Sequence, residues 1–219
     1  MAAPAFPDRA AAGRELAVEL GHLADHRPIV FGLPRCGVPV AYEIARHLRA
    51  PLDVALVRIV RAPDDRSRLV ATILEGHTPE VLIERDWEQA PGASREWLEA
   101  EVSAALAEIE DRRRRYRGTG GMISPSGRLA IVVDQSIGPG YAMAGAVRLL
   151  RAAGASKIVI AAPVASRPGV QRFEGLAART VYLRQESELA PIEHYYGDAA
   201  QVSHEEALAW LAQSTDPDE

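Results

Sequence analysis

Apolar and polar positions alternate in a way that predicts strands and helices in turn. Short runs that are apolar at nearly every position predict strands buried on both faces; these are residues 28–33, 52–57, 127–134, 157–162 and 180–183. Apolar residues at helical spacing predict helices over residues 10–24, 38–48, 94–116, 141–153, 168–178 and 203–211. Because parallel strands need crossover connections, this order predicts an α/β fold with a mostly parallel sheet and helices on both faces.

Two further stretches, residues 69–74 and 81–83, are rich in β-branched side chains and flank a Gly-His-Thr-Pro turn. They predict a small antiparallel insert in the parallel fold. No low-complexity linker divides the chain into halves. We therefore expect one domain over residues 1–213, followed by a flexible polar tail at 214–219.

Composition narrows the class of protein. The chain has 219 residues, of which 47% are hydrophobic and 25% charged, and its formal net charge is −5. The acidic balance argues against a general nucleic-acid binder, and no apolar run reaches the ~18 residues of a membrane helix. Cys36 is the single cysteine, which excludes a disulfide framework. Since the first residues also lack a signal-peptide pattern, we expect a cytoplasmic protein.

Arginine supplies all but one of the 25 basic side chains, and Lys157 is the single lysine. Lys157 begins a predicted strand, whereas an open parallel sheet binds ligands beyond the carboxyl ends of its strands. We therefore expect no lysine in the chemistry of the main site.

Three predicted strand ends carry candidate chemistry: residues 33–39, 57–59 and 134–141. Gly32 and Gly37 have the spacing of a P-loop start, but Val38 and Pro39 stand where lysine and a hydroxyl residue are required. No dinucleotide fingerprint or nucleophile elbow is present. His22 and His26 share a predicted helix face without a third ligand, so we predict no metal site there.

Several segments, taken in order and spacing, carry a resemblance along nearly the whole chain. They are FPDR at 6–9, LPRCGVPV at 33–40, VRI at 57–59, RRRRYRG at 112–118, VVDQSIGPGYAM at 132–143, PVA at 163–165, and a closing segment of Tyr196 followed by QVSHEE at 201–206. With these segments the chain resembles the type I phosphoribosyltransferase family, above all its stand-alone bacterial members.

The resemblance implies a central, mostly parallel sheet with a small hood, and a role in nucleotide metabolism. Family members use Mg²⁺ and 5-phosphoribosyl 1-diphosphate, and they displace diphosphate with a nitrogenous nucleophile. Two adjacent carboxylates contact the ribose hydroxyls, and the following loop binds the 5′-phosphate through backbone N–H groups and two threonine hydroxyls. The resemblance also implies a homodimer and a small ligand that is phosphorylated or contains ribose, with Mg²⁺ only if transfer is retained.

Matching the family motifs residue by residue assigns catalytic roles to Asp134, Arg35 and Arg58. The same match assigns the ligand-binding and phosphate-binding loops to Cys36, Gly37, Val38, Gln135, Ser136, Ile137, Gly138, Pro139, Gly140, Tyr141 and Ala142. No residue is assigned to a protein-bound metal.

The departures from the family pattern are concentrated in these loops. Gln135 replaces the second carboxylate, while Pro139 and Ala142 replace the two phosphate threonines; proline also lacks the backbone N–H. Hydrogen bonds to charged groups contribute ~1.5–3 kcal/mol each, so losing two hydroxyls costs ~3–6 kcal/mol, or about two to four decades of affinity. Tyr141 replaces a small residue at the edge of the same loop.

Three more departures point the same way. Cys36 and Ser136 replace glycines of the two loops, and Ile59 replaces the lysine that follows the family's arginine. A codon bias against lysine would have placed arginine at position 59, so the isoleucine indicates loss of a function at that position.

We favour a protein of this fold that has lost standard transfer and binds another ligand or catalyses another reaction. One alternative is an active phosphoribosyltransferase with an unusual site. Others are a non-enzymatic regulator, which would bind a nucleotide or nucleic acid through residues 112–115, and a partner subunit with an inactive site. For residues 112–115, pairing with Glu108 and Glu110 is the simpler interpretation.

Single residues carry alternatives of the same kind. In a redirected reaction, Asp134 would act as a base or metal ligand, Cys36 as a nucleophile, and Tyr141 as a hydrogen-bond donor or stacking ring. The structural alternatives are that Asp134 caps loop amides, Cys36 packs in the interior, and Tyr141 fills the phosphate space.

Overall fold

The computed structural model describes residues 4–76 and 78–214, and its centre is a six-stranded sheet. The strand order is β2-β1-β6-β8-β7, with β9 also pairing with β8, and every pair in this sheet is parallel. The strands are β1 (Ile29–Gly32), β2 (Leu52–Val54), β6 (Leu129–Val133), β7 (Ser136–Ile137), β8 (Lys157–Ser166) and β9 (Arg179–Glu186). The predicted parallel α/β architecture is confirmed.

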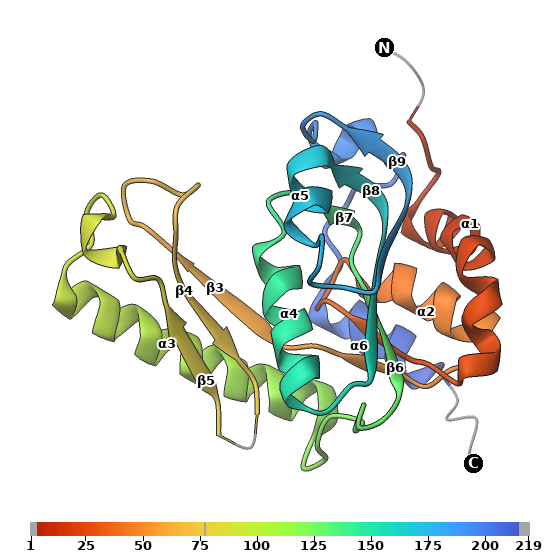
Figure 1. Ribbon diagram of the computed structural model, residues 1–219, viewed down its shortest axis with the longest axis horizontal. Coiled ribbons are helices and arrows are strands. Elements are labelled where there is room, and N and C mark those ends of the chain that lie inside the picture. Colours follow the sequence, from red (N-terminus) through yellow and green to blue (C-terminus); the bar gives the residue numbers. More distant parts are fainter. Residues whose placement is uncertain (1–3, 77, 215–219) are drawn as a thin grey trace.

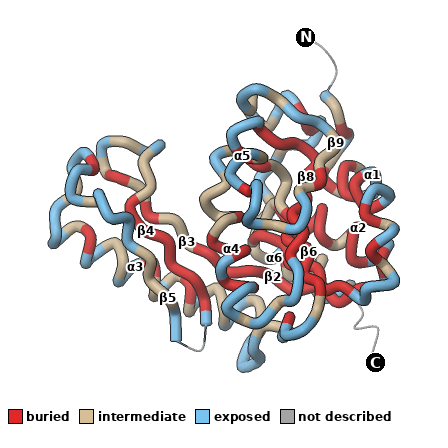
Figure 2. The backbone as a smooth tube through the Cα atoms, in the orientation of Figure 1, coloured by how far each residue is buried: buried red, intermediate tan, exposed pale blue. Residues whose placement is uncertain are grey.

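Helices cover both faces of this sheet (Figure 1). Alternate residues of a strand point to opposite faces: Phe31 of β1 packs in one cluster with α4, and Val30 packs in another with α1 and α2. Figure 2 shows the central strands as the buried layer between the helices. The helices around the sheet are α1 (Arg9–Leu20), which continues as the 3-10 turn η1 (Gly21–His26), α2 (Val38–Leu48), α4 (Tyr141–Ala152), α5 (Arg167–Arg172) and α6 (His204–Ala212).

Residues 57–76 and 78–117 form an arm that projects to the left of the main sheet in Figure 1. It holds the antiparallel strands β3 (Val57–Arg61), β4 (Leu69–Leu74) and β5 (Glu80–Ile83), the turn η2 (Trp87–Gln89) and the long helix α3 (Arg95–Arg117). The arm has its own apolar cluster, in which Val60, Ile73 and Ile109 are buried. The predicted antiparallel insert is therefore confirmed, and α3 forms its cover.

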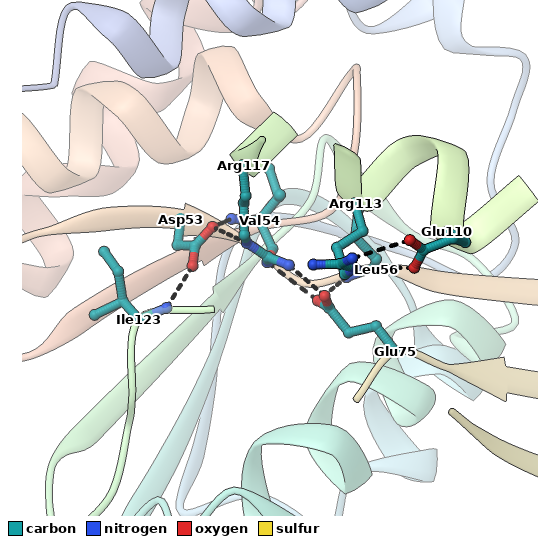
Figure 3. A network of polar contacts seen from close by, with 8 residues as sticks. All are labelled: Asp53, Val54, Leu56, Glu75, Glu110, Arg113, Arg117 and Ile123. Carbon is teal, nitrogen blue, oxygen red and sulfur yellow. Dashed lines mark hydrogen bonds and ion pairs between the residues drawn. The ribbon is translucent and has the colours of Figure 1, made fainter. Parts of the chain in front are cut away.

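A buried ion network fixes the arm to the main sheet (Figure 3). Arg117, at the end of α3, has a side chain only 6% exposed. Its Nε lies 3.0 Å from Asp53 of β2, and its guanidinium pairs with Glu75, which follows β4. Asp53 also accepts a 2.7 Å hydrogen bond from the backbone of Ile123. The network thus joins β2, the arm and the loop that returns to the sheet.

Several predicted elements were wrong in extent. Strand β8 continues to Ser166 instead of ending at residue 162, and β9 continues to Glu186 instead of ending at residue 183. The strand predicted over 52–57 is divided: β2 ends at Val54, and the chain leaves the main sheet to begin β3 at Val57. Between them the Leu56 amide donates to Glu75, 2.8 Å away, instead of to a neighbouring strand. The helix predicted over 168–178 ends at Arg172, and Gly175 has a φ of +74°, which is incompatible with a continued helix.

The first described residues pair with a segment near the C-terminus. Phe6 and Tyr196 form a parallel bridge, and their rings pack in a buried cluster with Val164 near the end of β8. The short turn η3 (Ile192–His194) belongs to the same segment. Within the described residues, no helix combines the length and the apolar character that crossing a membrane requires.

Candidate active site at the carboxyl edge of the sheet

Two loops predicted to share a ligand lie side by side. The loop of residues 33–37 follows β1 and the loop of residues 134–140 follows β6, and these strands are neighbours. The Leu33 amide donates to the Val133 carbonyl at 2.8 Å. A Cβ on Gly37 would lie 2.7 Å and 2.9 Å from the carbonyl oxygens of Leu33 and Val133. Only glycine fits this approach, so the residue 33–37 loop is held tightly against the end of β6.

Asp134 is the carboxylate that the sequence retains at the end of β6. Its Oδ1 accepts the backbone N–H of Gln135 at 2.7 Å, which is the capping contact that the sequence left open as an alternative. Burial raises the pKa of Asp134 to about 7, and the Gln135 amide and the charge of Arg9 offset this only in part. A carboxyl group with this pKa exchanges its proton near neutral pH.

Gln135 is engaged by residues from both ends of the chain. Arg9 of α1, only 6% exposed, donates from Nε to Gln135 Oε1 at 2.8 Å. The same guanidinium donates to the Ala200 carbonyl at 2.9 Å and lies 5.5 Å from the centre of the Tyr196 ring. The Tyr196 hydroxyl donates to the Gln135 carbonyl at 2.6 Å. The amide that replaces the family's second carboxylate is therefore part of an internal network.

The sequence did not predict that Arg9 and Tyr196 belong to this site. Each belongs to a segment that carried the family resemblance, which was the only available signal. Burial raises the pKa of Tyr196, a negative charge on Asp134 acts in the same direction, and the charge of Arg9 opposes the shift. Cys36 is a partly exposed free thiol beside this group.

The loop of residues 138–140 is held from below by α5. The Ser166 hydroxyl donates to the Gly138 carbonyl at 2.9 Å, and the Gly169 amide donates to the same hydroxyl oxygen at 3.0 Å. A Cβ on Gly169 would lie 2.3 Å from the Gly138 carbonyl. Gly140, with a φ of +77°, then leads into α4. The turn is rigid, and the exposed Pro139 at its tip brings no N–H.

Tyr141, the first residue of α4, has two arginines over its ring. The guanidinium carbon of Arg172 in α5 lies 4.6 Å from the ring centre, and that of Arg61 at the end of β3 lies 5.6 Å away. Arg172 also packs over Gly140, where a Cβ would lie 3.3 Å from its Cδ. Two cations thus stand where the resemblance places a phosphate.

Arg58 and Arg35, to which the family resemblance assigned catalytic roles, contact residues other than Asp134. Arg58 of β3 donates to Glu108 of α3 at 2.6 Å and to the Ile59 carbonyl at 2.8 Å, both within the arm. Arg35 has a φ of +68°, and its charge acts on Tyr116 and His204. Their described contacts do not join Arg35 or Arg58 to Asp134.

Near Arg35, positively charged arginines from distant parts of the chain surround a contact between Tyr116 and His204. The Tyr116 hydroxyl lies 2.9 Å from Nδ1 of His204. Burial lowers the pKa of His204, and the charges of Arg112, Arg35 and Arg115 lower it further. The buried Nε of Arg112 has no hydrogen-bond partner among the described residues.

The arginine run at the end of α3 is largely paired along its own helix. Arg112 pairs with Glu108, Arg113 and Arg114 pair with Glu110, and Arg115 pairs with Asp111. The pairs with Glu108 and Glu110 are those that the simpler interpretation predicted, and the pair with Asp111 adds to them, so the run is not a free basic surface.

The site residues do not fit a protein-held Mg²⁺. Within residues 4–76 and 78–214, no group of three or more His, Cys, Asp or Glu side chains could hold a metal ion. At the position where the family has paired carboxylates, Asp134 has a raised pKa and Gln135 is bound to Arg9. No chemical step is therefore assigned to a metal.

Comparisons with a family model, with curated proteins and with solved structures all relate the chain to phosphoribosyl transferases or to a protein of the same fold. Residues 5–181 match the family model described as phosphoribosyl transferase domain. The chain is 34% identical over 206 residues to "Putative phosphoribosyl transferase Rv0571c" of Mycobacterium tuberculosis, covering 94% of this chain and 46% of that protein. The chain thus spans about half the length of this curated relative. The crystal structure of TT1426 from Thermus thermophilus superposes with a TM-score of 0.80 at 33% identity, covering 96% of this chain and 99% of that one.

Proposed function

Given that the chain belongs to the family of phosphoribosyl transferase domains, we propose that it binds a small phosphorylated ligand at the carboxyl edge and has lost standard transfer from 5-phosphoribosyl 1-diphosphate. The observation that carries this proposal is the state of the loop after β6. The two residues at its ribose-contacting positions, Asp134 and Gln135, already form hydrogen bonds within the protein. The two hydroxyl groups with which the family contacts the phosphate are absent.

The ribose side of the proposal rests on Asp134 and Gln135. An ionised carboxylate pair would accept hydrogen bonds from both ribose hydroxyls. Here the one carboxyl has a pKa of about 7, and it already accepts the Gln135 amide. Binding ribose in the family manner would require breaking the Arg9–Gln135 contact inside a buried network.

The phosphate side rests on Arg61, Arg172 and Tyr141. Two guanidinium groups beside the first turn of α4 favour a phosphate, which Arg binds bidentately and the helix N-terminus attracts. Their geometry differs from that of two threonine hydroxyls, and Tyr141 adds an aromatic face on which a ring could stack. We therefore propose a phosphorylated ligand other than the standard donor.

Calorimetry with 5-phosphoribosyl 1-diphosphate and Mg²⁺ tests the loss of standard binding. We expect no measurable heat at sub-millimolar concentration, because the hydroxyl contacts are missing. The triple variant Gln135→Asp, Pro139→Thr and Ala142→Thr restores the family motif. It should raise the affinity for 5-phosphoribosyl 1-diphosphate by about two decades or more, which makes binding measurable. Micromolar binding to the unaltered protein would contradict the proposal.

The second candidate function is an active phosphoribosyltransferase that holds phosphate with arginine instead of threonine. The same contacts of Arg172 and Arg61 support it, and Asp134 could then accept a proton near neutral pH. Release of diphosphate from the donor in the presence of nitrogenous acceptors, abolished by Arg172→Ala, would establish this function in place of the first.

Other attributes of the whole protein remain proposals. A homodimer and a role in nucleotide metabolism are carried over from the family, and the cytoplasmic location rests on the cysteine count. A ligand that is not nucleic acid agrees with the net charge of −5 and with the paired arginines of α3.

A further inference from the structure

A second cavity lies at the opposite edge of the main sheet, where the strands begin. It has a volume of about 930 Å³, within the ~300–1,000 Å³ that small-molecule sites occupy. Its floor is apolar and buried, and includes Leu23, Leu129 and Val159. The cavity therefore has the volume and the buried apolar residues of a ligand site, and its lining includes no residue of the loops after β1 and β6.

The rim of this cavity is cationic. It holds Arg27, Arg49, Arg128, Lys157 and Arg179, together with His26, and no aspartate or glutamate lines it. None of the five lysine and arginine side chains takes part in an ion pair found among the described residues. In a chain with a net charge of −5, such a gathering of unpaired positive charge is opposite to the overall balance.

Helix ends account for only part of this charge. The turn η1 ends at His26 and α2 ends at Leu48, so their carbonyl ends carry partial negative charge near the cavity. Each helix end supplies about half a unit of negative charge, or about one unit together. Arg128 uses its donors on one such end, the Arg27 carbonyl, at 3.0 Å and 3.2 Å. Most of the five positive charges remain uncompensated.

The backbone at two rim positions is also unusual. Arg27 and Arg49 cap η1 and α2 in the left-handed region, with φ of 47° and 50°. Glycine is the usual residue at such caps, because a side chain is strained there. Arginine at both positions places two positive charges at the cavity at a cost in backbone energy, which points to a function for them.

We propose that this cavity binds an organic polyphosphate, that is, a small anion with at least two phosphate groups joined to an apolar or planar group. Arginine matches phosphate oxygens in bidentate geometry, and the buried floor suits the apolar portion of such a ligand. The proposal is independent of the function proposed for the carboxyl edge, since the two sites share no residue.

The test uses calorimetry with three probes: adenosine triphosphate, inorganic tripolyphosphate and adenosine. We expect adenosine triphosphate to bind more tightly than tripolyphosphate, and adenosine not to bind. The double variant Lys157→Glu with Arg179→Glu reverses two exposed rim charges and should weaken binding of adenosine triphosphate at least tenfold, which is about 1.4 kcal/mol. The matched control Arg66→Glu with Arg85→Glu makes the same charge change at exposed arm positions and should leave the affinity unchanged.

A further variant guards against loss of folding. Arg49→Gly removes a rim charge and relieves the positive φ, so it should weaken binding without lowering the melting temperature. Arg172→Gln alters the carboxyl edge and should leave cavity binding intact.

The proposal would be overturned by no binding of either polyphosphate, by equal weakening in the arm control, or by loss of binding with Arg172→Gln but not with the rim variants. Binding of an oligonucleotide where adenosine triphosphate does not bind would also overturn it.

Discussion

At the scale of single residues, Asp134 shows how much the surroundings decide. The side chain was identified from its position after an apolar strand, but its charge state follows from burial. With a pKa of about 7, it is a protonated or half-protonated group at neutral pH instead of a fixed anion. This difference separates a carboxylate that binds ribose hydroxyls from one that can transfer a proton.

The pH dependence of stability tests this state of Asp134. The carboxyl group ionises near 3.8 when unfolded and near 7 when folded, so the folded protein binds the extra proton between these values. The free energy of unfolding should therefore fall as pH rises from about 4 to about 7, by an amount on the order of 3 kcal/mol, relative to Asp134→Asn. Urea titrations of both proteins across this range provide the measurement. Parallel curves for the two proteins would show that the carboxyl group is not perturbed.

At the scale of elements, capping residues mark where helices begin. Ser94, Ser166 and Ser203 each accept a backbone N–H at the start of α3, α5 and α6. α6 has a full capping box: Glu206 donates its amide to the Ser203 hydroxyl at 3.0 Å and accepts the Ser203 amide at 2.7 Å. This cap holds the first residue of α6, His204, against Tyr116.

Removing this cap should loosen α6. We expect Ser203→Ala to lower the free energy of unfolding by about 1 kcal/mol, because one amide loses its acceptor. In a background in which Trp87 and Trp97 of the arm are replaced by Phe, the fluorescence of Trp210, whose ring lies 4.9 Å from that of Tyr42, reports on this helix. Ser103→Ala, at an exposed position within α3, is the control and should be neutral or slightly stabilising. Equal loss in both variants would contradict a specific capping role.

At the scale of the whole molecule, the arm and the main sheet depend on one buried ion network. Arg117, Asp53 and Glu75 come from three elements and are each largely buried. Burial raises the pKa of Glu75, and Arg117 opposes that shift. Burying three charges stabilises only when they remain paired, so the network specifies how the arm is attached.

Breaking the network should cost more than any surface pair. We expect Arg117→Met to lower the free energy of unfolding by about 3–5 kcal/mol, because two buried carboxylates lose their partner. Arg114→Met lies on the same helix, but Arg114 is 68% exposed, so it should cost less than about 1 kcal/mol. Chemical denaturation measures both, and faster proteolysis of the arm in Arg117→Met would show where the loss acts. A similar small effect in both variants would mean that the network does not hold the arm.

The sequence alone determined the order of strands and helices, the parallel sheet and the antiparallel insert, whereas its assignment of the ligand-binding loops stays a prediction. These elements can be predicted because an element buried on one or two faces has hydrophobic residues at a regular spacing along the chain. Parallel strands also place their carboxyl ends at one edge of the sheet. The sequence also shows directly which hydroxyls and carboxylates of the family motif are missing, because Gln135, Pro139 and Ala142 stand at those positions. The register of β8 confirms the expectation that Lys157 lies away from this edge.

Only the tertiary structure decided which distant residues meet. No local pattern indicates that Arg9 reaches Gln135, that the strand after Leu52 turns away at Val54, or that Lys157 joins four arginines around one cavity. These contacts depend on how the layers pack, and the pKa of a buried group depends on the water that the packing excludes. Periodicity records whether a residue is buried, whereas the partner of that residue is fixed by the topology of the whole chain.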